Sequence, residues 1–308
     1  MPIDPDLLVD RRRLRRQITV WRTLAVIALV GIVAAGVGRA KLFGERHVAR
    51  LSVSGIITDD PDRTRAIVAA AEDANVRAVI VRIDSPGGTV VGGESLFREL
   101  RELGQKKPVV AVLGELAASG GYMAALAAEQ IFAREGTVTG SIGVIMQTVD
   151  VTGLLEKMGV KTEALKSGPY KAVPSPLEPL TDRGREVTRQ LVEDMYGMFV
   201  DMVAERRKLD RGRTLELADG RVYTGRQAKA LGLVDAIGGE DEARAWLSEA
   251  KGISKALPVR ELRITREDED WSGWMGETLA RITGKTYLSE RLKLDGLVAV
   301  WHPDLRAQ

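Results

Sequence analysis

Two residue types that often carry catalysis are missing or scarce in this chain. None of its 308 residues is cysteine, which excludes disulfides, thiol nucleophiles and thiolate metal sites. Only two histidines occur, His47 and His302, and neither lies in a glycine-rich loop of the kind that presents catalytic groups. The histidine of a Ser-His-Asp triad is therefore expected to be absent, and we expect no metal and no cofactor.

Aromatic residues and net charge are also low. Aromatic residues make up 5% of the chain against 44% hydrophobic residues in total, so its core must consist mainly of Val, Ile, Leu and Ala. The length suits one large domain or two modest ones. The formal net charge is +2, and no basic stripe interleaved with aromatic residues is present. Nucleic acid is therefore not expected as a partner.

One long apolar run lies near the N-terminus. Residues 18–38 carry a single charge, Arg22, and would measure about 31 Å as a helix, enough to cross a bilayer if that arginine snorkels. Five arginines lie in Arg11–Arg16. This basic block predicts a cytoplasmic segment 1–17, a transmembrane helix 18–38 in contact with membrane lipid, and a domain on the far side of the membrane. The alternative is a cleaved signal peptide, although "AAGVGRA" offers no clean cleavage site.

The rest of the chain alternates between strand and helix patterns. Strands are expected at Arg46–Thr58 and Val76–Asp84, a helix at Arg63–Ala74, and a glycine-rich turn at Ser85–Gly93. This order predicts an α/β fold of repeated βαβ units, with a catalytic domain at 46–250. A long amphipathic helix around Val187–Val203 would serve the core or a subunit interface.

The last part of the chain differs in composition. Residues 251–308 are expected to form a C-terminal extension that is mainly helical. Within it, Trp271 and Trp274 are three residues apart, a spacing that suits an amphipathic helix packed on the domain or a contact with the membrane surface.

A single serine stands among very small residues in "GELAASGGYMAA" (114–125), directly after the apolar run Pro108–Leu113. Serine is a weak nucleophile unless a neighbouring base removes its proton. With histidine unsuitable, the base that remains is a lysine in a setting that keeps it neutral near pH 7. Lys171 is the leading candidate, because prolines at 169, 174 and 176 restrict its loop, whereas Lys166 and the other lysines suit exposed positions.

Five separated motifs, in order and spacing, resemble one protease family. The chain is similar to the signal peptide peptidase A family, membrane-anchored serine proteases with a Ser/Lys dyad and a crotonase-like fold related to the Clp protease. The similarity covers about Val48–Arg244. The motifs are "DSPGG" (84–88), "ASGGYMAA" (118–125), "TGSIGV" (139–144), "KSGPYKAVPSPLEPLT" (166–181) and "DGRVYTGRQAKALGLVDAIGG" (219–239).

The resemblance implies roles for individual residues. By motif position Ser119 matches the nucleophile and Lys171 the general base. One departure is that Ala172 and Val173 follow the lysine, where an acidic residue and another apolar one are common. The family also implies signal-peptide remnants as substrates, a periplasmic catalytic domain on the bacterial inner membrane, and a ring-like homo-oligomer whose neighbouring subunits complete each site.

Glycines beside the serine supply candidate oxyanion donors. Gly120 follows Ser119 at the start of a helix, and Gly87 or Gly88 lies in a turn expected at the same edge of the sheet. The alternative is that these glycines have only a structural role, in tight turns and close packing.

Two other functions remain open on the sequence. A crotonase-type acyl-CoA hydratase or isomerase would use carboxylates such as Glu94 or Glu115. A non-catalytic, membrane-tethered scaffold would have no use for Ser119.

Overall fold

The computed structural model describes residues 18–31, 45–265 and 297–300, in two units divided after Arg46. In the first unit residues 18–31 are helical. None of the helices in the described ranges is both long enough and apolar enough to pass through a membrane. Residues 1–17 and 32–38 lie outside the described residues, so the structure describes only the first part of the expected transmembrane segment 18–38.

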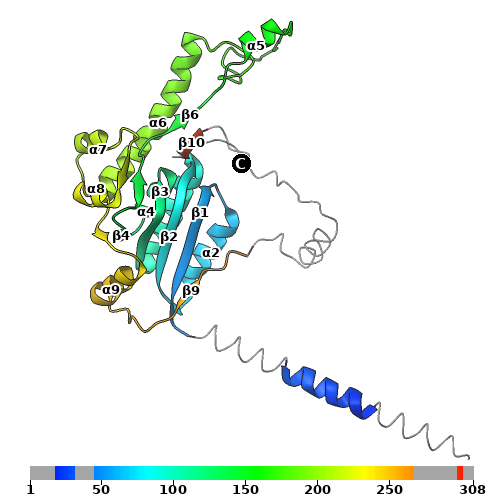
Figure 1. Cartoon of the computed structure of the whole chain (residues 1–308), viewed down its shortest axis with the longest axis vertical. Helices are drawn as coiled ribbons and strands as arrows, with labels where there is room; N and C mark the ends of the chain where they lie inside the picture. The colour runs from blue at the N-terminus through cyan, green and yellow to red at the C-terminus, as the bar shows by residue number, and fades with distance from the viewer. Residues whose placement is uncertain (1–17, 32–44, 266–296, 301–308) are drawn as a thin grey trace, which may run out of the picture. The chain divides into compact units, whose positions relative to one another are not determined.

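The second unit is built on one mixed sheet (Figure 1). In the described part of the chain this sheet has ten strands, and its main path runs β6-β10-β2-β3-β4-β8. The strands are β1 (His47–Ile57), β2 (Val76–Thr89), β3 (Val109–Ala118), β4 (Gln130–Ala133), β5 (Val138–Gly140), β6 (Ile145–Met146), β7 (Val222–Thr224), β8 (Ala236–Ile237), β9 (Val259–Glu261) and β10 (Leu297–Val300).

Helices connect most of these strands. Strands β1 to β4 are parallel and alternate with α2, α3 and α4, which confirms the α/β class and its βαβ units. The helices are α2 (Pro61–Glu72), α3 (Val90–Lys106), α4 (Gly120–Ala125), α5 (Thr152–Lys157), α6 (Asp182–Arg207), α7 (Arg211–Leu217), α8 (Gly225–Ala230) and α9 (Glu240–Lys251).

Alternation along the central strands produces two cores, one on each face of the sheet. On β2, Val79, Val81 and Ile83 pack with α2, α3, α4 and α6, whereas Ala78 and Ile80 pack with α9 on the opposite face. The same alternation occurs on β3. Because successive strand side chains point to opposite faces, a nearly continuous apolar run is what a strand covered on both faces requires.

Strand β2 is longer than expected. It continues through the expected glycine turn to Thr89, and Gly88 pairs with Ile57 of β1. A Cβ atom at Gly88 would lie 1.7 Å from the Ile57 carbonyl oxygen, so this pairing requires glycine. The glycines of "SPGG" therefore extend the strand and do not end it.

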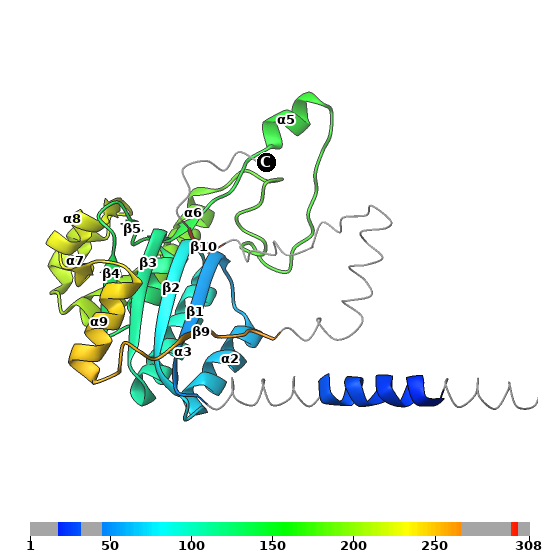
Figure 2. The ribbon, with the colours of Figure 1, turned by 60° about the horizontal axis from the view of Figure 1, so that its bottom comes forward.

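The segment between β6 and α6 stands away from the sheet in both views (Figures 1 and 2). We call residues 147–181, which include α5, the arm. Helix α6 begins where the Thr181 hydroxyl accepts a hydrogen bond from the Gly184 N–H at 3.1 Å. Near its other end Phe199, Val200 and Val203 are buried in the main core, which supports the core interpretation of this helix.

The described part of the C-terminal extension contains two strands. After α9, β9 pairs in parallel with β1, and β10 pairs antiparallel with β2 and β6. Residues 266–296 and 301–308 lie outside the described residues, so the expectation of a mainly helical extension stays a prediction. Both β1 and β2 offer free edges at these positions, and pairing satisfies their backbone groups. Trp271 and Trp274 lie outside the described residues.

Two glycines of α3 provide a matched test of this packing. Alanine at Gly92 would place its Cβ 2.6 Å from the Thr58 carbonyl carbon, whereas alanine at Gly104 finds nothing closer than 3.9 Å. We expect Gly92→Ala to lower the free energy of unfolding by about 2 kcal/mol or more. Gly104→Ala should raise it by about 0.5–1 kcal/mol, since alanine favours a helix. Urea unfolding of both variants measures the difference; equal stabilities would contradict the close approach of β1 and α3.

Candidate active site

Ser119 lies between the end of β3 and the start of α4. It occupies the N-cap position of α4, but its side chain makes no capping hydrogen bond. Its φ of 53° is in the left-handed region, which a non-glycine residue seldom adopts and which costs roughly 1–3 kcal/mol. A strained serine whose hydroxyl is left out of the helix cap is typical of a functional position, not of a structural cap.

The backbone around Ser119 is held on both sides. Its N–H donates to the Gly140 carbonyl at 2.8 Å, and its own carbonyl accepts from the Met123 N–H at 2.8 Å. Helix α4 is anchored below the serine by Tyr122, a fully buried side chain whose hydroxyl donates to the Leu233 carbonyl at 2.7 Å. Burial raises the pKa of Tyr122, so that it stays a neutral donor. The strained conformation is therefore fixed by the surrounding fold.

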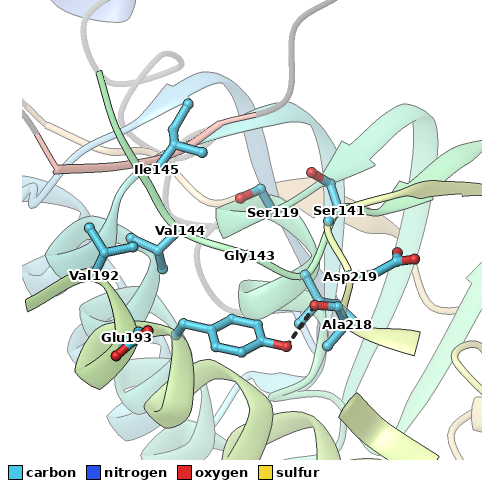
Figure 3. Close-up of a pocket in the computed structure, with 12 residues that line it drawn as sticks. Ser119, Ser141, Gly143, Val144, Ile145, Val192, Glu193, Ala218 and Asp219 are labelled. Carbon is cyan, nitrogen blue, oxygen red and sulfur yellow. Dashed lines mark hydrogen bonds between the residues drawn. The ribbon is translucent and has the colours of Figure 1, made fainter. Parts of the chain in front are cut away.

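Ser119 lines a pocket of about 400 Å³ (Figure 3). Its walls come from the stretch after β5, from α6 and from the turn before β7. The apolar part of the lining consists of Ile142, Val144, Ile145, Val192 and Ala218. The Tyr196 hydroxyl donates to the Ala218 carbonyl at 2.8 Å and so joins α6 to the opposite wall. A pocket of this size and character can hold an apolar side chain together with the peptide backbone next to it.

Two carboxylates at the pocket are already paired. Glu193 lies 2.9 Å from Arg189 along α6. Asp219 accepts from the Arg221 Nε at 2.7 Å, and this hydrogen bond keeps the pKa of the Asp219 carboxyl below its usual range. Because the lowered pKa makes the Asp219 carboxylate a weaker proton acceptor, Asp219 is a poor candidate for a general base at Ser119.

The three candidate oxyanion donors lie at the same end of the sheet as Ser119. Gly120 is the first residue of α4, where an N–H has no partner within the helix. Gly87 and Gly88 belong to β2, next to β3. The Gly87 N–H donates to the Ser85 hydroxyl at 3.0 Å, so in this structure that amide is already engaged.

Lys171 is not at this pocket. It lies in the arm, its side chain is exposed, and none of the described residues that line the pocket is a lysine. Its backbone N–H donates to the Gly168 carbonyl at 3.2 Å, and the next residue, Ala172, has a φ of 63°. The arm fixes the loop that carries Lys171, yet within one chain it does not bring that lysine to Ser119.

Other groups considered on the sequence lie elsewhere. Lys166 forms an ion pair with Glu178 inside the arm. Glu94 accepts from the Arg98 side chain on the surface of α3, and Glu115 is exposed on β3. Neither carboxylate lines the pocket. Over the ranges that the structure describes, no cluster of three or more His, Asp and Glu side chains could hold a metal ion.

One residue of the pocket was not singled out from the sequence. Ser141 follows β5 with a φ of 49°, and its N–H donates to the Arg221 carbonyl at 2.8 Å. It lines the same pocket as Ser119 (Figure 3). The glycines at 140 and 143 in "TGSIGV" were the available signal, since they permit a tight backbone near the Ser141 hydroxyl.

Comparisons with known proteins show the family of the chain. Residues 101–254 match the model of peptidase family S49. The chain is 42% identical over 212 residues to a putative protease of Synechocystis, covering 68% of this chain and 76% of that one. It is 32% identical over 262 residues to a putative signal peptide peptidase of Enterococcus faecium, covering 80% of this chain and 76% of that one.

The comparison of structures gives a weaker similarity. A ClpP1 mutant of Listeria monocytogenes aligns with 65% of this chain and 95% of its own, with a TM-score of 0.44 and 18% identity.

A strained serine at an apolar pocket and the match over residues 101–254 define a serine protease. The chain belongs to peptidase family S49, and it is a protease of the signal peptide peptidase A type. This assignment decides against both the acyl-CoA hydratase and the non-catalytic scaffold.

Proposed function

We propose that this chain hydrolyses peptides by acyl transfer through Ser119, with Lys171 of a neighbouring copy as the base. The observation that carries the proposal is Ser119 itself, strained, uncapped and lining an apolar pocket. The family resemblance adds the lysine, since Lys171 occupies the motif position of the general base.

The chemistry needs one group that moves protons. Neutral Lys171 takes the proton from the Ser119 hydroxyl while the serine oxygen bonds to the peptide carbonyl carbon. The carbon–nitrogen bond then breaks, and the leaving amine takes that proton from the lysine. Water attacks the acyl-enzyme, giving its proton to Lys171, which returns it to the serine oxygen as the peptide acid leaves. Backbone N–H groups at Gly120 and at Gly87 or Gly88 would hold the oxyanion.

We assign the lysine to a neighbouring copy because the arm exposes apolar side chains that favour contact with another protein. The arm holds itself together through hydrogen bonds such as Val151 N–H to the Pro176 carbonyl at 3.0 Å. Several large apolar side chains nevertheless point to solvent, and such a surface favours association with another protein. They are Val149, Leu154, Met158, Val160, Leu165, Tyr170 and Leu177, exposed by 44–96%.

In a closed ring, every copy would receive a Lys171 from one neighbour and so have a complete site. A head-to-tail contact that closes on itself gives each chain one arm received and one arm donated. The crotonase and Clp-like architecture implied by the resemblance is compatible with the βαβ units of the second unit.

Membrane anchoring remains part of the proposal on sequence grounds. The apolar run 18–38 behind the basic block would tether the protease with its N-terminus in the cytoplasm and its catalytic unit in the periplasm. Signal-peptide remnants, apolar and released at the membrane, match the apolar walls of the pocket.

The dyad is tested by two substitutions. Ser119→Ala removes the nucleophile, and Lys171→Arg keeps a cation that cannot give up its proton in this pH range. We expect kcat/KM for an apolar reporter peptide to fall at least about 10³-fold in both variants. Lys161→Arg, also in the arm, is the matched control and should keep normal activity. Near-normal hydrolysis by Lys171→Arg would remove Lys171 as the base.

The shared site is tested by mixing two inactive chains. Co-expressed Ser119→Ala and Lys171→Ala chains should regain activity, because random assembly joins an intact serine to an intact lysine at about a quarter of the interfaces. If each site were complete within one chain, every site in the mixture would remain defective. Absence of recovered hydrolysis in oligomers shown to contain both chains would contradict the shared site.

The topology is tested with a reporter that is active only in the cytoplasm. Fused after Gln308, it should be silent in cells, whereas the same reporter fused before Met1 should be active. Activity of the C-terminal fusion would reverse the proposed orientation.

A further inference from the structure

A fully buried serine, Ser85, lies on β2 beside the turn that carries Ser119. It pairs with Ala117 of β3, two residues before the candidate nucleophile. Its carbonyl oxygen touches the start of α4, since a Cβ atom at Gly121 would lie 3.0 Å from it. Ser85 does not line the pocket, and its hydroxyl takes no part in the proposed acyl transfer. Any role in the site must therefore come through the backbone groups that this hydroxyl binds.

The ladder between β1 and β2 is irregular next to Ser85. Its register shifts between Ser54 and Ile56, so that Gly55 of β1 faces two residues of β2, Ser85 and Pro86. Such a β-bulge leaves the ladder locally incomplete. Proline has no N–H, so the backbone of β2 cannot supply a donor at Pro86. A side chain is needed to satisfy the Gly55 carbonyl.

The Ser85 hydroxyl supplies that donor and also accepts a hydrogen bond. It donates to the Gly55 carbonyl at 2.5 Å and accepts from the Gly87 N–H at 3.0 Å. The Gly87 carbonyl, at 3.3 Å, is the more distant of the two acceptors within reach of the hydroxyl hydrogen. A hydroxyl has one hydrogen and two lone pairs, so it can serve both strands at once. Ser85 thereby ties the end of β2 to β1 and fixes the peptide unit that joins Pro86 to Gly87.

This tie holds a part of the backbone that could otherwise turn. Gly87 has a φ of 112°, in a region that glycine adopts far more readily than other residues, and a second glycine, Gly88, follows it. Without a fixed partner, consecutive glycines can change the direction of their N–H groups at little steric cost. An oxyanion donor is effective only when its direction is set before the reaction. A hydroxyl that fixes this glycine pair therefore bears on catalysis.

The same hydrogen bond chooses between the two candidate donors on β2. Continuing the pairing of β2 with β3 by two residues puts Gly87 level with Ser119. Because Ser85 already binds the Gly87 N–H, that group is not available to an oxyanion. The N–H of Gly88 is then the candidate that remains on this strand, together with that of Gly120 on α4.

We propose that Ser85 is a positioning residue for the hydrolysis: its hydroxyl holds the Gly87 peptide unit, so that Gly88 supplies the oxyanion donor of β2. This inference rests on the proposed peptidase function and adds a residue to its site. Ser85 acts only through the two glycines and does not touch the substrate. Since the oxyanion forms on the way through the transition state, loss of the hydroxyl should weaken transition-state binding and leave binding of the peptide unchanged.

The first test replaces the hydroxyl. Ser85→Ala removes both hydrogen bonds without adding volume, and we expect kcat for an apolar reporter peptide to fall at least about tenfold with KM unchanged. A peptide aldehyde is the probe of the oxyanion site: the Ser119 oxygen bonds to its carbon, the serine proton passes to the lysine, and the carbonyl oxygen becomes the oxyanion. Its affinity should fall by the same factor as kcat. Ser85→Cys, whose S–H is a weak donor, should lie between the two chains.

Thr137→Ala is the matched control. Thr137 is also buried, and its hydroxyl donates to the Gly114 carbonyl at 2.8 Å and accepts from the Arg134 N–H at 3.0 Å. Its loss should lower the free energy of unfolding about as much as Ser85→Ala does, measured by urea unfolding. Its kcat and aldehyde affinity should nevertheless match those of the unaltered chain. An equal fall of kcat in both variants would assign the effect to stability and overturn the positioning role.

A second readout uses the unaltered chain, so it decides even if Ser85→Ala fails to fold. Pro86–Gly87 is the only Pro-Gly bond in the sequence, so proline labelled with ¹³C at the carbonyl and glycine labelled with ¹⁵N select the Gly87 amide in an NMR spectrum. We expect no new hydrogen bond at this amide when the aldehyde is added, because its N–H stays with Ser85. A large downfield shift would show that the Gly87 N–H moves to the oxyanion, and would overturn the proposal.

The outcomes separate this inference from the function on which it rests. Unchanged kcat and unchanged aldehyde affinity in Ser85→Ala would overturn the positioning role and leave the peptidase function intact. If the unaltered, assembled chain neither hydrolyses peptides nor binds the aldehyde, the peptidase function itself fails, and the role of Ser85 fails with it.

Discussion

The site depends on backbone segments that lie too close together for a side chain to fit between them. Gly88 allows β2 to pair with the end of β1, and Gly92 allows α3 to start against the same strand. At Gly121 a Cβ atom would lie 3.0 Å from the Ser85 carbonyl oxygen, so the start of α4 also rests on the end of β2. These contacts fix the turn at Ser119, and the rigid support makes its unfavourable φ tolerable.

Within one chain, the same arrangement leaves the site without its proposed general base. The fold positions a hydroxyl, candidate oxyanion donors and an apolar pocket, but within one chain Lys171 stays on the exposed arm. Dividing the site between two copies would couple activity to assembly, since a separate chain would hold a serine without its base.

The sequence predicted the α/β units, because apolar alternation is a local signal, whereas the turn expected at Gly87 and Gly88 is part of β2. The extension of β2 to Thr89 and the strand β10 were not predicted. Both depend on pairing between residues distant in the sequence, Gly88 with Ile57 and with Ala299. Ser141 was missed for the same reason, since only the fold brings it to the pocket of Ser119.

The most direct test of the central claim is labelling of the full chain with a fluorophosphonate, followed by mapping of the modified peptide. A serine activated by a neighbouring base attacks the phosphorus, whereas an ordinary serine does not. The account predicts one modification per chain, at Ser119, and its loss when the arm's Lys171 is replaced by arginine. Labelling at a different serine, or no labelling of an assembled and hydrolytically active protein, would contradict it.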